Sequence, residues 1–187
     1  MNTNVLSLSD YGFFLISPEK MKKFLKEKRI RGKKILTKLN EHNDLYLESL
    51  KCGAWLPIVE VDAIDYTMIF NRDECEENWT VVCEVGEFNL SVGSDNTIWL
   101  GSLISLDKWD ANNFKVEDDV ISYSTFSGEV LNKFIRYRIK EGKYKVKISS
   151  LKKSDSDEYG FYFDFKEVEF FDCIIDPRDE NYDFNIK

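Results

Sequence analysis

The most regular pattern of apolar and polar residues lies in two segments, residues 144–148 and 161–165. In each segment apolar side chains occupy every second position, which is typical of a strand with one face on a core and one in water. We expect the two segments to form a β-hairpin, because one register buries the aromatic residues of both and a one-residue slip would turn them outward. The expected cross-strand pairs are Ile148 with Phe161, Val146 with Phe163, Tyr144 with Phe165, and Lys145 with Asp164.

The residues that join and follow these two strands are polar. The connection SSLKKSDSDE is expected to form a loop, with Asp155, Asp157 and Glu158 exposed at its tip. After residue 165 the apolar positions change phase, so we expect a bulge or bend at Lys166 and Glu167.

A helical pattern precedes the strands. The apolar run at residues 11–16 is compatible with an edge strand. Ser17, Pro18 and Glu19 then match an N-cap, a first-turn proline and a first-turn acid, so a helix should begin there. Gly32 is expected to end this helix, and a second short helix is expected to span residues 33–41.

From residue 45 onward the pattern indicates mostly strands. Residues 88–92 and 97–100 predict a second hairpin, residues 71–78 predict a polar turn, and residues 129–134 are compatible with either a strand or a helical turn. In the second hairpin, Val92 is expected to face Ile98 and Leu90 to face Leu100. Further strands are expected at residues 58–62, 64–70, 79–85 and 120–126, with a bulge near Ala63 and a strand edge at Pro57, whereas residues 130–139 mix the strand and helix periods.

These elements predict an α+β protein that is mostly antiparallel β, either a sandwich or a strongly bent sheet, with one or two N-terminal helices. A chain of 187 residues suits one domain. We expect a single domain, 1–187, built from a basic helical segment at 17–41, a β-rich body at 45–171 and an acidic tail at 172–187.

Charge is unevenly distributed along the chain. The formal net charge is -8, yet residues 18–40 hold ten lysines or arginines and two acids, whereas residues 154–183 hold eleven acids. An acidic total disfavours a nucleic-acid partner. We interpret the basic helices as an amphipathic lid whose lysines face water or the acidic body, with a nucleic-acid or membrane-surface contact as the alternative.

The residue types that carry most catalysis are scarce. His42 is the only histidine, the four cysteines form no CxxC pair, and no phosphate-binding glycine motif occurs. We therefore expect no catalytic residues, no metal, no cofactor and no enzymatic activity, and we expect reduced, mostly buried cysteines. The N-terminus does not match a signal peptide and no apolar window approaches the length of a membrane span, so a cytoplasmic protein without a membrane partner is expected.

Acids and tyrosines cluster in the last third of the chain. The stretches SDSDE and DPRDENYD superficially resemble calcium loops, but both lack the central glycine. Tyrosine beside carboxylates suits a surface that binds lysine and arginine side chains of a protein. The tail is expected to be either an edge strand followed by a tether or a segment that orders only against a partner. The candidate partner-binding residues are Asp155, Asp157, Glu158, Tyr159, Asp176, Asp179, Glu180 and Tyr182.

The segment IKEGKYKVKISSLKK, followed by YGFYFDF, resembles the closing strands of bacterial immunity and nuclease-inhibitor proteins, including the competence nuclease inhibitor type. The resemblance covers about a fifth of the chain. It implies a compact cytoplasmic inhibitor that covers the basic active-site surface of a toxin or nuclease. Two other interpretations stay open: a β-rich domain that binds a small ligand in a Trp-lined cavity, and an enzyme that uses acids alone or with a divalent cation.

Overall fold

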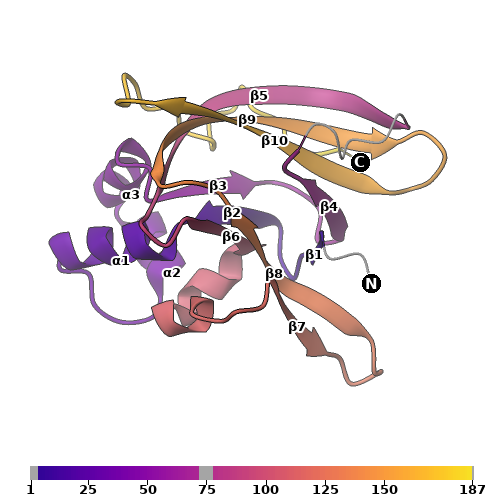
Figure 1. Ribbon diagram of the computed structural model, residues 1–187, viewed down its shortest axis with the longest axis horizontal. Helices are drawn as coiled ribbons and strands as arrows, with labels where there is room; N and C mark the ends of the chain where they lie inside the picture. Colours follow the sequence, from indigo (N-terminus) through magenta and orange to yellow (C-terminus); the bar gives the residue numbers. More distant parts are fainter. Residues whose placement is uncertain (1–3, 72–77, 187) are drawn as a thin grey trace.

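The computed structural model describes residues 4–71 and 78–186, which form two packed β-sheets with helices on the outside of one of them (Figure 1). The first sheet, sheet A, has the order β1 (Val5–Ser7), β4 (Asp65–Ile69), β10 (Tyr159–Val168), β9 (Gly142–Lys153) and β5 (Trp79–Val92). The second, sheet B, has the order β3 (Trp55–Val59), β2 (Gly12–Ile16), β6 (Thr97–Ser102), β8 (Val130–Arg138) and β7 (Val120–Ser124).

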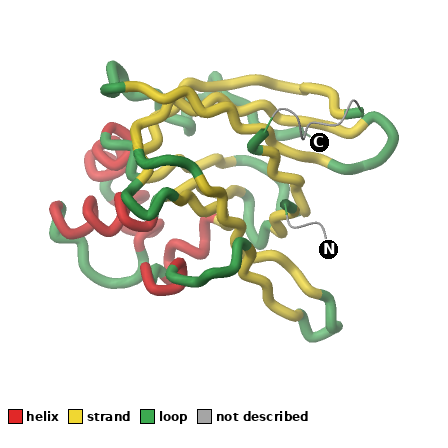
Figure 2. Tube along the Cα trace, in the orientation of Figure 1, coloured by secondary structure: helices red, strands yellow, loops and turns green. Residues whose placement is uncertain are grey.

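The helices are α1 (Pro18–Glu27), α2 (Ile35–Glu41) and α3 (Asn43–Lys51), followed later in the chain by the 3-10 helices η2 (Leu103–Lys108) and η3 (Ala111–Phe114). Figure 2 shows that they gather on one side of the strands. The strand pairs are antiparallel except for β4 with β10, which are parallel. The predicted α+β class, mostly antiparallel, is confirmed.

Strand β2 shows why the protein has two cores. Its Phe13 points between the sheets and contacts Phe161 at a ring-centroid distance of 4.9 Å, whereas Phe14 points toward the helices and contacts Phe134. Both faces are covered, so all five residues are buried and the sequence is a continuous apolar run. The prediction of an edge strand at residues 11–16 was therefore wrong, because β2 lies between β3 and β6.

The β9–β10 hairpin exists with the predicted faces but in another register. Phe163 lies opposite Ile148, two residues from the predicted pairing, and Asp164 lies opposite Lys147. The shift arises because residues 149–153 belong to β9 and only five residues form the turn. A shift of two keeps every side chain on its face. The predicted bulge at Lys166 and Glu167 was also wrong, since pairing continues without a break to Val168.

The expected second hairpin was wrong for a different reason. Leu90 and Val92 belong to β5 in sheet A, whereas Ile98 and Leu100 belong to β6 in sheet B. All four side chains are buried in the core between the sheets, so they share that core from opposite sides rather than pairing within one sheet. The chain changes sheet in the same way between β3 and β4, and Pro57 lies on the edge strand β3, as predicted.

Three helices precede the strand-rich part of the chain, rather than one or two. Helix α1 begins at Pro18 as predicted but ends at Glu27, and Arg29 has a positive φ of 55°, before the predicted stop at Gly32. Helix α3 lies where strands were expected, with Tyr46, Ser49 and Leu50 buried at helical spacing. The ambiguous residues 130–134 are strand, while residues 72–77 of the expected polar turn lie outside the described residues.

Residues 172–186 of the tail form no helix or strand, yet their apolar side chains are part of the core. Phe184 and Ile186 are buried between the sheets, and Tyr182 contacts Phe88 of β5 edge-to-face at 5.5 Å. The Asn89 side-chain amide also donates to the Cys173 carbonyl. The tail is thus neither an edge strand with a tether nor a segment that waits for a partner, because its apolar side chains complete the core beside β5.

Candidate functional site

The predicted acidic tip is the turn between β9 and β10, residues 154–158, here called the acidic loop. All five residues are exposed. The Lys153 amide donates to the Glu158 carbonyl at 2.9 Å, and the Lys153 ammonium lies 3.2 Å from the Glu158 carboxylate. No cation among the described residues forms an ion pair with Asp155 or Asp157, and both residues are exposed.

Tyr159 does not lie on this surface. Only 7% of its area is exposed, and its ring belongs to the core between the sheets with Phe161. Tyr159 is the first residue of β10, where the alternation that buries Phe161 also turns position 159 inward. We therefore leave Tyr159 out of the candidate surface.

The aspartates of the tail have a structural use that explains their number. Three of them, Asp176, Asp179 and Asp183, each accept a hydrogen bond from the backbone amide two residues later, which forms an Asx-turn and bends the chain. The pairs are Asp176 with Arg178, Asp179 with Asn181, and Asp183 with Asn185, at 2.9, 3.0 and 2.9 Å. A recurring aspartate is thus the sequence signal for a tail that turns repeatedly while it follows the surface of the protein.

Asp176 is committed to internal contacts. The Tyr46 hydroxyl donates to its carboxylate at 2.6 Å, and the Arg178 guanidinium lies 3.4 Å from the same carboxylate. The guanidinium also stacks on the Tyr46 ring and donates to Asn43. Burial, helped by the Asp176 carboxylate, raises the pKa of the Tyr46 hydroxyl, so this hydroxyl stays a donor. Asp176 therefore holds the tail on α3 rather than presenting a free charge.

Three other acids of the tail, Asp179, Glu180 and Asp183, line a pocket of about 360 Å³. Its acidic lining adds two residues that sequence reasoning did not select, Glu60 and Asp183. The pocket is lined by Val59, Glu60, Pro177, Arg178, Asp179, Glu180, Tyr182, Asp183 and Asn185. The Arg178 charge is already paired with Asp176, so the pocket is negative overall. It lies beside the end of β3, whereas the acidic loop lies beside the start of β5, so the predicted acids form two separate groups.

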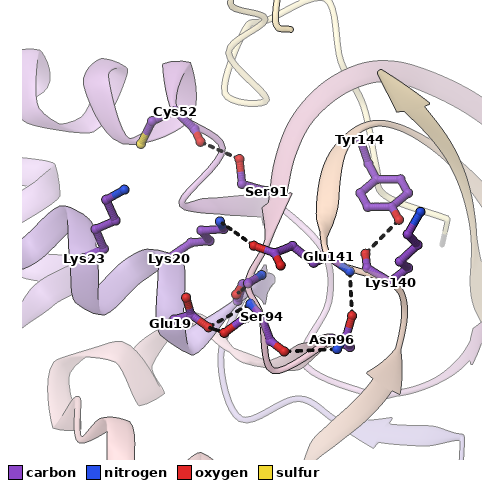
Figure 3. A network of polar contacts seen from close by, with 12 residues as sticks. Glu19, Lys20, Lys23, Cys52, Ser91, Ser94, Asn96, Lys140, Glu141 and Tyr144 are labelled. Atoms are coloured by element: carbon purple, nitrogen blue, oxygen red, sulfur yellow. Dashed lines mark hydrogen bonds and ion pairs between the residues drawn. The ribbon is translucent and has the colours of Figure 1, made fainter. Parts of the chain in front are cut away.

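Charged side chains of α1 attach the basic helical segment, residues 17–41, to the β-rich body. The Glu19 carboxylate accepts from the Ser94 amide and hydroxyl at 2.8 Å each, and Lys20 pairs with Glu141 at 3.8 Å (Figure 3). Hydrogen bonding from Ser94 lowers the pKa of Glu19. These contacts attach α1 to the connection between β5 and β6 through Ser94, and to the connection between β8 and β9 through Glu141. They agree with the interpretation of a helical lid.

The tryptophans do not form the cavity that a ligand-binding domain would need. Trp55 is 1% exposed and its indole donates to the Ser49 hydroxyl at 2.8 Å. Trp99 is 1% exposed beneath Phe114 and the Arg136 guanidinium. Both rings fill the core between sheet B and the helices. Among the described residues, a pocket of about 400 Å³ beside α1 and η3 is lined by Phe114 and Arg136, among others, but by neither of these tryptophans.

Groups suited to metal binding or to a membrane do not occur in the described ranges. Across residues 4–71 and 78–186, no three His, Cys, Asp or Glu side chains are placed to hold a metal ion, and no helix there is long and apolar enough to cross a membrane. Cys52 and Cys173 are free and exposed, and Cys83 is free and half-buried, so the expectation of mostly buried cysteines was wrong for these three; Cys75 lies outside the described residues.

No family model and no curated protein matches the chain. A search of solved structures finds similarity to ComJ, the inhibitor of the DNA degrading activity of NucA, from Bacillus subtilis. The TM-score is 0.46, with 13% identical residues, over 88% of this chain and 93% of that chain. ComJ is an inhibitor of the kind that residues 139–165 resemble.

Proposed function

We propose that the chain is a non-catalytic protein-binding module, an immunity protein or inhibitor that blocks a basic toxin or nuclease. The observation that supports this most is the acidic loop. It presents Asp155, Asp157 and Glu158 on a five-residue turn between two strands that bury Val146, Ile148, Phe161 and Phe163 in the core. The partner would contact these carboxylates with lysine and arginine side chains.

Backbone hydrogen bonds at the base of the acidic loop favour a binding role over that of an ordinary solvated turn. The Ser154 amide donates to the Asn78 carbonyl at 2.9 Å, which ties the turn to the start of β5. A turn held by backbone hydrogen bonds loses less conformational entropy on binding than a free loop. Exposed charges act chiefly on the rate of encounter, and salt screens them with a Debye length of about 8 Å at physiological ionic strength.

The test is a pull-down from the native host followed by binding kinetics at two salt concentrations. Replacing Asp155, Asp157 and Glu158 together by lysine should slow association about tenfold or more at low salt, with a nearly unchanged melting temperature. The matched control replaces Glu117, Asp118 and Glu129, which are also exposed acids, so that the net charge changes equally on another surface. Recovery of no protein partner, or an association rate indifferent to salt and to the loop reversal, would contradict the proposal.

A further inference from the structure

Strand β5 has two halves in different surroundings. Residues 88–92 are buried, and Phe88 is covered by Tyr182 and Phe184 of the tail. Residues 79–85 form the outer edge of sheet A, where Val81 is 56% exposed and Val82 is 50% exposed. Within residues 4–71 and 78–186, no strand pairs with this outer edge. The backbone there offers hydrogen-bonding groups beside apolar side chains.

Natural sheets usually protect such an edge with proline, lysine or other charged side chains, or a bulge. The segment WTVVCEV has no proline or lysine, one exposed acid, Glu84, and a bulge. At the bulge, Val81 lies opposite Leu151 and Cys83 opposite Ser150, so Val82 is the additional residue. A bulge changes the direction of side chains locally, and here two consecutive valines, Val81 and Val82, are both exposed at the edge. We call Trp79, Val81 and Val82 the apolar edge.

The apolar edge is continuous with the acidic loop. The Thr80 and Ser154 hydroxyls are 3.3 Å apart, and the Lys153 ammonium lies 5.6 Å from the centre of the Trp79 ring. The Trp79 ring also lies over Gly160, where an added Cβ would come within 3.3 Å of it. Exposed apolar side chains and unpaired carboxylates thus lie side by side at one end of sheet A.

We propose that an extended basic segment of a protein partner adds to sheet A as a strand along residues 79–85 of β5. Backbone hydrogen bonds would hold the segment, Val81 and Val82 would contact its apolar side chains, and the acidic loop would pair with its lysines or arginines. Seven residues span about 23 Å, an ordinary strand length. The inference rests on the proposed function and supplies the apolar anchor that the buried Tyr159 does not.

Charge favours a basic partner over a second copy of this chain. Antiparallel pairing of two β5 edges centred on Val82 would bring the acidic loop of one copy near the region of Glu84 and Glu87 of the other. Glu87 is exposed, and like charges at such a junction oppose association. A segment with alternating lysines meets the same acids with opposite charge.

The probe is a capped octapeptide that alternates lysine and valine, with a lysine–serine octapeptide as its control. The lysine–valine peptide should slow amide hydrogen exchange in residues 79–85, and the lysine–serine peptide should do so much less. The double substitution V81S/V82S keeps the charge and should weaken binding about tenfold. The matched control Y123S/V130S removes apolar groups that are 43% and 40% exposed on the β7–β8 hairpin and should leave binding unchanged.

Each other outcome counts against strand addition at β5. Unchanged exchange at residues 79–85, equal protection of β7, an edge strand of sheet B, or equal weakening by both double substitutions would overturn it. A dimer in sedimentation that V81S/V82S abolishes would show that a second copy occupies the edge. Failure of the proposed function has a separate signature, because the peptide could protect β5 while the host pull-down recovers no partner.

Discussion

At the scale of single residues, Phe163 tests the packing between the sheets. Its side chain is fully buried, with Phe13 edge-to-face at 6.2 Å and Phe70 stacked at 5.5 Å. Phe163→Ala should lower the free energy of unfolding by about 3 to 5 kcal/mol, because it removes apolar contact and leaves a cavity. Denaturant titration measures the change, with the fully exposed Phe126→Ala as a control near zero. A loss below about 1 kcal/mol for Phe163 would contradict this packing.

Asp172 provides a test with pH. Its carboxylate lies 2.8 Å from the Lys145 ammonium, whose side chain is only 7% exposed, and this contact lowers the Asp172 pKa to about 2. For Lys145, burial alone would lower the pKa, but hydrogen bonds to Asp172 and Cys173 outweigh it and raise the pKa. Because the folded-state pKa of Asp172 is depressed, the contribution of the contact is full above the ordinary aspartate pKa of 3.8 and is lost as pH falls to about 2.

Melting temperatures of the wild type and Asp172→Asn should therefore differ at pH 6 and converge toward pH 2. Asp157→Asn serves as the control, since no described cation pairs with Asp157. A difference between wild type and Asp172→Asn that is the same at both ends of this range would show that the ion pair does not contribute.

At the scale of elements, the contact of the tail with α3 is testable through Tyr46. Tyr46→Phe removes the hydrogen bond to Asp176 and should lower the free energy of unfolding by about 1 to 3 kcal/mol, because a charged acceptor loses its donor. Amide exchange in residues 176–183 should quicken more than exchange in β9. Tyr123→Phe, on the exposed β7, is the matched control. Unchanged protection of the tail would show that other contacts hold it.

The elements also show what the sequence pattern could predict. Alternation identified the faces of β9 and β10, because faces depend only on whether a position is odd or even. It did not identify the register, because Ser149 and Ser150 are polar yet buried strand residues, and the pattern assigned them to a loop. Leu90 and Leu100 could face each other as cross-strand neighbours in one sheet, or from two sheets across the core. The apolar pattern is the same in both arrangements, so it could not distinguish them.

At the scale of the whole molecule, the exposure of the acidic loop could be predicted from the sequence, whereas the contacts of the tail could not. The acidic loop was found because a polar turn between two alternating strands must reach solvent. The tail was wrongly expected to be an edge strand with a tether or a segment that orders only against a partner. Its aspartates bend the backbone, and the sequence alone does not distinguish aspartates that form turns from aspartates that only face solvent. The free edge of β5 could not be predicted at all. Edge position is a property of strand order, which brings together residues far apart in sequence.

The buried tail has a consequence for synthesis of the protein. Phe184 and Ile186 are core residues that the ribosome adds after the strands β1 to β10 have been made. A nascent chain that stops short of them leaves Phe88 and the side of the core around it open to water. Strand β5 is synthesised long before Phe184, so its exposed edge is made before the tail residues that cover Phe88. The core beside β5 is complete only when residue 186 has been added.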